Sequence, residues 1–334
     1  MVIGARGVGD SIGLIGCGSI GSRHARNLRE LGIERLLLYD SDRDRAASLA
    51  AAVGAEWVAS VEEVLQARPL AVLVCTPPHL HVPVSRQAIA AGAHVFVEKP
   101  LSTSLDGTEE LIEVAAQAGK RVIVGCNMRF HPGVAQIRAA LTRAAVGRPW
   151  FFRAHYGHYL PFWRPGQDYR LSHSGHRGQG GGLTIECIHE IDYLRWLAGE
   201  VKAVDATRAR VGELDIETED FASLTLSFEA GCMAQVQLDC LRWFKSRGCE
   251  VVGENGIVVW VSQGRAPEAV EVRFFDKNRR RWESLYREDA YDGNLMYVEE
   301  MRQFLDCLSG ASTELLDVAD ARRVLEIALA ASTG

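Results

Sequence analysis

Two hydrophobic patterns alternate along the first 125 residues and predict strands and helices in turn. Short runs that are apolar at nearly every position predict buried strands, and longer segments with apolar residues three or four positions apart predict helices. The expected strands are 11–15, 35–39, 70–75, 93–97 and 121–124, and the expected helices are 23–31, 82–91 and 105–118. Strands that alternate with helices predict a parallel sheet covered on both faces, a doubly wound α/β domain.

The second half of the chain follows a different pattern, in which single apolar and polar residues alternate. Residues 221–228 and 233–238 both alternate, and the turn at 229–231 between them predicts a hairpin. Further expected strands are 150–158, 203–211 and 249–261, and the expected closing helices are 296–308 and 318–331. This half therefore predicts a second, sheet-based domain, and we divide the chain into domains 1–125 and 126–334.

Composition narrows the class of protein. With 334 residues the chain is long enough for two domains, and its net charge of −6 argues against a nucleic-acid partner. The apolar runs fall far short of the roughly 20 residues of a membrane span, so no membrane partner is expected. Eight Cys without a C-x-x-C pair indicate free thiols in a reducing compartment, so we expect a cytoplasmic protein.

A glycine-rich motif follows the first predicted strand. Gly16, Gly18 and Gly21 form G-x-G-x-x-G between a strand and a helix, the context in which this motif binds a dinucleotide. Gly16 permits the tight turn, Gly18 lets the backbone approach a pyrophosphate, and Gly21 lets the helix pack closely. The helix N-terminus then offers N–H groups to the phosphates. The cofactor-binding residues expected in this turn are Gly16, Cys17, Gly18, Ser19, Ile20 and Gly21.

Asp40 ends the second predicted strand, about twenty residues after the glycine motif. A carboxylate at this place can accept hydrogen bonds from both ribose hydroxyls and repels a 2′-phosphate, so NAD is the expected cofactor. The alternative role for Asp40 is a turn or helix cap. Arg43 keeps NADP open, because a nearby Arg can accommodate the 2′-phosphate.

More candidate residues follow the later strands of the first domain. Ligands of such sheets bind at the carboxyl ends of the strands. The further cofactor-binding residues expected there are Thr76, Pro77, His79, Glu98, Lys99 and Asn127. Lys99 is notable because only five of the 37 basic residues are Lys. A Lys in a closed site can exchange protons or polarise a carbonyl, whereas the alternative is a surface ion pair with Glu98.

The second domain offers a loop rich in aromatic residues and Arg, followed by a helical segment. Spacings of three, four and seven place Glu186, His189 and Tyr193 on one helix face. The alternative for His189 is a core histidine with its hydrogen bonds satisfied. The expected substrate residues are Arg129, Trp163, Arg164, Tyr169, Arg170 and Tyr193. The pairs His155/His158 and His173/His176 could ligate a metal with His189, but no compact ligand motif joins them, so no metal is expected.

Several of these motifs recur together in one family. They are the glycine turn, Thr76-Pro77-Pro78, Glu98-Lys99-Pro100 and the stretch Gly180-Gly181-Gly182…His189…Asp192. On these residues the chain resembles the Gfo/Idh/MocA family of NAD(P)-dependent sugar and cyclitol oxidoreductases, from about residue 11 to residue 332. The resemblance implies a Rossmann domain and then an α+β domain with an open, mostly antiparallel sheet.

The resemblance also implies site residues and an assembly. It gives Lys99 and His189 catalytic roles, and it implies a homodimer or homotetramer formed through the second-domain sheet. Many members have an Asp four residues before that His, where this chain has Ile185. Glu186, three residues before His189, shares the helix face and is the candidate for that role.

Together these features predict hydride transfer between a nicotinamide cofactor and a secondary alcohol of a sugar derivative. His189 would move the hydroxyl proton, and Lys99 would hydrogen-bond the same oxygen. Arg164 and Arg170 favour an anionic sugar derivative, a sugar acid or sugar nucleotide, unless they merely brace their loop against Asp168 and Glu186. The alternatives are an inositol or free-sugar dehydrogenase and a non-catalytic dinucleotide sensor.

Overall fold

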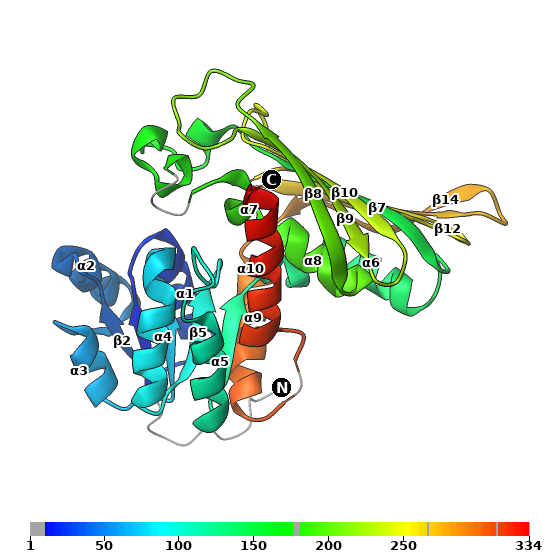
Figure 1. Cartoon of the computed structure of the whole chain (residues 1–334). Helices are drawn as coiled ribbons and strands as arrows, with labels where there is room; N and C mark the ends of the chain where they lie inside the picture. The colour runs from blue at the N-terminus through cyan, green and yellow to red at the C-terminus, as the bar shows by residue number, and fades with distance from the viewer. Residues whose placement is uncertain (1–10, 177–180, 266, 312, 334) are drawn as a thin grey trace. The chain divides into compact units, whose positions relative to one another are not determined.

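The computed structural model describes residues 11–176, 181–265, 267–311 and 313–333, which form two compact units (Figure 1). The first unit contains the chain up to Cys126 together with Tyr297–Arg322. The second contains Asn127–Met296 and the residues from Arg323 onward. The division expected from the sequence, at 125/126, assigns everything after residue 125 to one domain. The structure differs, because Tyr297–Arg322 belongs to the first unit.

The first unit is built on a seven-stranded sheet with the strand order β15-β6-β5-β4-β1-β2-β3. Its strands are β1 (Ser11–Ile15), β2 (Arg35–Tyr39), β3 (Glu56–Trp57), β4 (Ala71–Val74), β5 (His94–Glu98), β6 (Val122–Gly125) and β15 (Leu316–Asp317). All pairings are parallel except that of the short β15 with β6. The order reverses between β1 and β4, the point at which such sheets bind their ligands. The expected doubly wound fold is confirmed.

Helices cover both faces of this sheet. They are α1 (Ser19–Glu30), α2 (Arg43–Val53), α3 (Val61–Gln66), α4 (His81–Ala90), α5 (Thr108–Gln117) and α9 (Leu295–Leu308). Ile12 and Leu14 of β1 pack into one core cluster with Leu28 of α1 and Phe304 of α9. Gly13, between them, faces the other way, toward Val64 of α3. Because both faces are buried, the strands are apolar at nearly every position.

The second unit is built on an eight-stranded sheet with the order β14-β13-β12-β11-β7-β10-β9-β8. Its strands are β7 (Pro149–Gly157), β8 (Val201–Ala209), β9 (Phe221–Phe228), β10 (Met233–Asp239), β11 (Ser246–Gly253), β12 (Gly256–Gly264), β13 (Glu268–Asp276) and β14 (Arg281–Tyr291). Its helices include α6 (Pro132–Thr142), α7 (Leu183–Glu186) and α8 (Ile188–Ala198), and α10 (Val318–Thr333) ends the chain's described part. Only the pairing of β10 with β7 is parallel among the described strands.

The expected hairpin at 221–238 is confirmed by β9 and β10, in which Leu224 pairs with Val236. The expected single strand 249–261 is wrong. It is divided between β11 and β12, which turn at Glu254 and Asn255. Apolar residues lie on both sides of that turn, at the end of β11 and the start of β12. The hydrophobic pattern of the sequence therefore does not show where one strand ends and the next begins.

Helix α6 packs very closely on the sheet of the second unit. Gly133, in the first turn of α6, lies against the indole of Trp260, and a Cβ at this position would collide with the ring. One face of the sheet is thereby covered by helices. No helix among the described residues has the combined length and hydropathy that crossing a membrane requires.

Candidate active site

The glycine turn joins β1 to α1 in the first unit. Gly16 has a φ of 100°, a conformation that favours glycine, and its N–H donates to the carbonyl of Tyr39. Gly21 lies against the Gly16 backbone, where a Cβ would collide. Around Gly18 the space is open, since a Cβ built there would meet no atom within 4 Å. The three glycines therefore differ in their surroundings as the motif requires.

The open space at Gly18 lies at the start of α1, where the pyrophosphate of a dinucleotide would bind. Gly18 is the N-cap of the helix, and no acidic residue lies in the first turn. The first N–H groups of a helix have no partner within it, and they carry the positive end of the helix dipole. Backbone access and a positive helix end are what a pyrophosphate needs, so the residues present fit the cofactor.

Asp40 lies next to this turn and is buried. Its Oδ2 accepts a hydrogen bond from the Cys17 N–H at 2.7 Å, and its Oδ1 accepts one from the Asp42 N–H at 2.8 Å. Arg45 of α2 forms an ion pair with Asp40 at 3.2 Å. Arg43, by contrast, lies over the ring of Trp57, with the guanidinium carbon 4.7 Å from the ring centroid. Arg45, which the sequence analysis missed, is therefore the basic residue beside Asp40.

The thiol of Cys17 belongs to the same turn. Burial and the neighbouring Asp40 carboxylate raise its pKa to about 12. The thiol is accordingly protonated at neutral pH and is not a nucleophile. Its contribution to the site is the backbone N–H that binds Asp40.

The other expected cofactor residues follow β4, β5 and β6. Thr76 and Pro77 follow β4 after one intervening residue, Cys75. His79 is exposed on a short 3-10 helix, Pro78–Leu80. Glu98 is the last residue of β5, and Lys99, which is partly exposed, follows it. Thr76, Pro77, Glu98 and Lys99 therefore share the carboxyl edge of the sheet in the first unit. Asn127 is buried and begins a 3-10 helix at the start of the second unit.

The imidazole of His24, in α1, contacts the Glu98 carboxylate. The His24 Nε2 and the Glu98 Oε1 are 2.6 Å apart, and both side chains are buried. The other Glu98 oxygen accepts a hydrogen bond from the Lys99 N–H at 3.2 Å. The Glu98 carboxylate is thus held by the His24 ring and by the backbone N–H of Lys99.

The helical segment that carries Glu186 and His189 is interrupted. Helix α7 ends at Glu186, Cys187 has φ −97° and ψ 32°, and α8 begins at Ile188. Glu186 and His189 are consequently on two helices, and the expectation of one continuous helix face is wrong. Helix α7 begins after Gly182, whose φ of 132° favours glycine, and Glu219 accepts the Leu183 N–H. Gly180 lies outside the described residues.

Glu186 and His189 are both partly exposed, in contrast to their neighbours. The Glu186 Oε1 accepts a hydrogen bond from the Ser174 hydroxyl at 2.6 Å. Glu190 is fully buried and forms an ion pair with Arg247 of β11 at 2.8 Å. Partial exposure leaves Glu186 and His189 accessible, unlike the buried Glu190.

Two of the expected substrate residues lie in the core of the second unit. Arg129 is buried and binds both oxygens of Asp192, with Nη2 to Oδ1 at 2.7 Å and Nε to Oδ2 at 3.0 Å. Tyr193 is fully buried and packs edge-on against Trp260. In this structure neither side chain has the exposed surface with which to contact a substrate.

The other four expected substrate residues lie in the loop that follows β7. Arg170 binds both oxygens of Asp168, at 2.9 and 2.6 Å. Arg164 donates to Ser172 at 2.6 Å, and the Trp163 indole N–H donates to the His158 carbonyl at 2.8 Å. The Tyr169 hydroxyl accepts the N–H of Asp215. The pair of Arg170 with Asp168 matches the bracing alternative, whereas Arg164 binds serines in place of Glu186.

The described residues contain no group of three His, Cys, Asp or Glu side chains placed to hold a metal ion. His155 is engaged with the Ser246 hydroxyl, 3.0 Å away, and the side chain of His173 lies outside what the structure describes.

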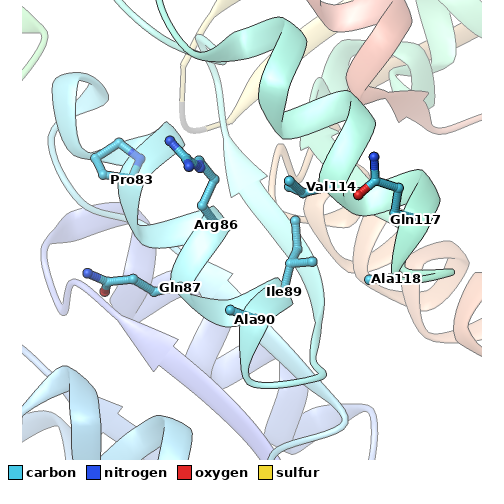
Figure 2. Close-up of a pocket in the computed structure, with 8 residues that line it drawn as sticks. All are labelled: Pro83, Arg86, Gln87, Ile89, Ala90, Val114, Gln117 and Ala118. Carbon is cyan, nitrogen blue, oxygen red and sulfur yellow. The ribbon is translucent and has the colours of Figure 1, made fainter.

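A separate hollow lies on the outer surface of the first unit, between α4 and α5 (Figure 2). Its volume is about 640 Å³. Its lining is formed by Pro83, Arg86, Gln87, Ile89, Ala90, Val114, Gln117 and Ala118. Most of these residues lie toward the C-terminal ends of the two helices, away from the carboxyl edge of the strands. The lining holds no acid, His or Cys, and Arg86 is paired with Glu110, so the hollow is not a catalytic site.

Comparison with known proteins agrees with this description. The family model described as "Oxidoreductase family, NAD-binding Rossmann fold" matches residues 11–126, and the GFO/IDH/MocA C-terminal domain matches residues 134–259. Inositol 2-dehydrogenase 3 of Saccharopolyspora erythraea is 32% identical over 294 residues, which cover 85% of this chain and 82% of that protein. Inositol 2-dehydrogenase of Cereibacter sphaeroides is 30% identical over 293 residues, covering 85% and 83%.

Solved structures share the fold. Levoglucosan dehydrogenase in complex with NADH has a TM-score of 0.83 at 21% identity, covering 97% of this chain and 96% of that one. GenD2 from gentamicin A biosynthesis, in complex with NAD, has a TM-score of 0.80 at 25% identity, covering 99% and 96%.

Proposed function

The chain belongs to the Gfo/Idh/MocA oxidoreductase family, and from this premise we propose that it oxidises a secondary hydroxyl of a neutral cyclic polyol or sugar. It is an NAD-dependent dehydrogenase acting on CH–OH groups. The choice of a neutral substrate rests on one observation: Arg164 and Arg170, in the loop after β7, are hydrogen-bonded to other residues of that loop.

In this proposal the cofactor is held by the carboxyl edge of the first sheet. Gly18 and the start of α1 bind the pyrophosphate, and Asp40 accepts the ribose hydroxyls. The nicotinamide, when bound, supplies the acceptor for the hydride. Lys99 and Thr76 follow neighbouring strands at this edge.

His189 and Lys99 carry the proton chemistry. A ring nitrogen of His189 takes the hydroxyl proton during oxidation and returns it during reduction. The Lys99 Nζ donates a hydrogen bond to the same oxygen and stabilises the negative charge that develops there. Glu186, fixed by Ser174, orients a neighbouring substrate hydroxyl or His189.

The engaged Arg residues favour a neutral substrate. A guanidinium group that is already hydrogen-bonded within the protein has fewer donors left for an anionic substrate. In the structure Asp168 neutralises Arg170, and two serines bind Arg164. Arg129 and Arg247 are each paired with a buried carboxylate as well. Relatives named as inositol 2-dehydrogenases agree with a neutral polyol.

A substrate panel tests this proposal. Reduction of NAD is followed with neutral cyclitols, free hexoses, sugar acids and sugar nucleotides, and kcat/KM is compared between the classes. We expect neutral cyclitols or sugars to give the highest values, and Arg170→Ala to leave them unchanged. A sugar acid or sugar nucleotide that is preferred by more than tenfold, with the preference lost in Arg170→Ala, would overturn the proposal.

We also propose that the second-unit sheet forms a homo-oligomer through the face not covered by α6 and α8. One row of cross-strand neighbours on that face is apolar across six strands: Met233, Phe151, Val252, Ile257, Phe275 and Trp282. Met233, Phe151 and Trp282 are 48%, 39% and 46% exposed. A continuous exposed apolar row of this kind is typical of protein interfaces. Light scattering should give a dimer or tetramer, and Phe151→Glu should lower the mass; a wild-type monomer contradicts the proposal.

A further inference from the structure

Two buried histidines lie on either side of the tripeptide Glu98-Lys99-Pro100. His24 comes from the middle of α1, and His81 is the first residue of α4. Neither histidine was predicted from the sequence to be a site residue, and neither takes part in the proposed chemistry. All five residues belong to the first unit.

His24 holds the residue before Lys99. Its Nε2 lies 2.6 Å from the Glu98 Oε1, while the Glu98 Oε2 accepts the Lys99 N–H. The ring is also packed edge-on against Phe96 and Tyr297. The direction of the Glu98 carboxylate is therefore fixed by a hydrogen bond and by its rigidly packed partner.

His81 holds the residue after Lys99. Its Nδ1 lies 2.8 Å from the Pro100 carbonyl oxygen, and its Nε2 lies 2.8 Å from the Thr76 carbonyl oxygen. The residue is only 1% exposed. The ring therefore connects the loop after β4 to the loop after β5, and both loops contain expected cofactor residues.

The protonation of His81 bears on this connection. Burial lowers its pKa, and the nearby His79 opposes a charged ring, whereas the two carbonyls and Glu98 favour one. A neutral ring donates one hydrogen bond and a charged ring donates two. A neutral ring can therefore hydrogen-bond only one of the two carbonyls, and a charged ring can hydrogen-bond both.

We propose that His24 and His81 are positioning residues that fix Lys99 from both sides. Neither ring touches the reacting atoms in this proposal. The tripeptide backbone sets the origin of the lysine side chain, and a displacement of about 1 Å at a reacting group can lower a rate about 10²-fold. The proposal rests on the catalytic role of Lys99 in the proposed function.

A double-mutant cycle tests the proposal on the full-length protein. His81→Leu removes both ring nitrogens, Lys99→Ala removes the amine, and the third variant combines them. The assay uses NAD and the best neutral polyol or sugar from the panel. We expect His81→Leu to lower kcat about 10- to 100-fold, within the range of such misplacement. In the Lys99→Ala background the same substitution should have almost no further effect.

The control is His94→Asn, which removes the imidazole of another histidine of this sheet, at the start of β5. His94 accepts the Arg121 N–H at the opposite end of the strand from Lys99, and its replacement should leave kcat unchanged. Equal effects of His81→Leu in both backgrounds, or no effect in either, overturn the proposal. If Lys99→Ala alone retains full turnover, the role of Lys99 under the proposed function fails instead.

A second measurement does not depend on turnover or on the Leu variant. His81→Asn, His24→Gln and His94→Asn are compared with the wild type by NMR after methylation of the lysines with ¹³C-labelled reagent. The chain has only five Lys, and Lys99→Arg assigns the signal. We expect the Lys99 signal to move in the His81 and His24 variants and to stay unchanged in the His94 variant. An unchanged Lys99 signal in both overturns the proposal.

Discussion

The Asp40 carboxylate accepts a hydrogen bond from the backbone N–H of Cys17 at 2.7 Å, which joins the end of β2 to the glycine turn. The residue that we propose selects the cofactor therefore also holds the glycine turn in place. Arg45 lies on the other side of the same carboxylate, 3.2 Å from Oδ1. Asp40 therefore acts in two ways: its oxygen accepts a backbone hydrogen bond, and its charge pairs with Arg45.

Asp40→Asn should narrow the preference for NAD over NADP by about tenfold, equivalent to about 1.4 kcal/mol. The amide oxygen can still accept the Cys17 N–H, and the repulsion of a 2′-phosphate is gone. Arg45 loses one of its two carboxylate partners and keeps Asp42, so its guanidinium is better able to bind the phosphate. Calorimetry with both cofactors measures the change. Adding Arg45→Ala should reverse the gain in NADP affinity; an NADP affinity insensitive to Arg45 contradicts this explanation.

His189→Ala should lower kcat by roughly 10²–10⁴-fold, the usual contribution of a general acid or base. NAD affinity should remain nearly the same, because the proposed role of His189 is proton transfer and not cofactor binding. Steady-state kinetics and calorimetry provide the two readouts, with His155→Asn as a matched control on β7. If His189→Ala keeps more than about a tenth of the wild-type kcat, the histidine is structural.

The ion pair between Glu190 and Arg247 should be important for stability. Both side chains are buried, and the guanidinium lies over the Tyr156 ring at 4.3 Å. Arg247→Met leaves the Glu190 charge buried without its partner, which should lower the free energy of unfolding by about 3–5 kcal/mol. Urea denaturation measures this loss. Asp168→Asn, which breaks the exposed pair with Arg170, should cause almost none; similar midpoints for the two variants would contradict the assignment.

Glu268 gives the second unit a dependence on pH. Burial raises the pKa of this carboxyl, but the hydrogen bond with His131 and the charge of Lys245 together lower it to about 2. The unfolded value is near 4.5, so the carboxylate stabilises the fold above that pH and loses its contribution as the pH falls toward 2. Glu268→Gln should be less stable than the wild type at pH 6, and the gap should shrink between pH 5 and pH 3. A gap that stays constant over this range argues against the effect.

The sequence predicted the first unit well because both faces of its sheet are buried. Strands such as Ala71–Val74 are then apolar throughout, and the glycine turn marks the switch point. Helix α2 was missed, since its run of Ala and Arg between 43 and 53 has no clear apolar stripe. Strands β13 and β14 were missed because the outer hairpin alternates only partly and carries many charged residues.

The partners of the site residues could not be predicted from sequence. Arg129 and Asp192 are 63 positions apart, and His24 and Glu98 are 74 apart. Only the folded chain brings such pairs together, so Arg129 was interpreted as a substrate residue although it is buried in an ion pair. His24 carried one signal that could have revealed it: it precedes Ala25 on the core-facing side of α1, where a polar residue needs a partner.

The transfer of a labelled hydride tests the central claim most directly. The protein is incubated with NAD and neutral cyclitols or sugars that carry deuterium on the carbons bearing their secondary hydroxyls, and the cofactor is analysed by mass spectrometry. We predict that deuterium appears in the reduced nicotinamide with the wild type and is almost absent with His189→Ala. If the wild type binds NAD but the nicotinamide acquires no deuterium from any substrate class, the protein is a dinucleotide sensor, and that result contradicts the proposed hydride transfer.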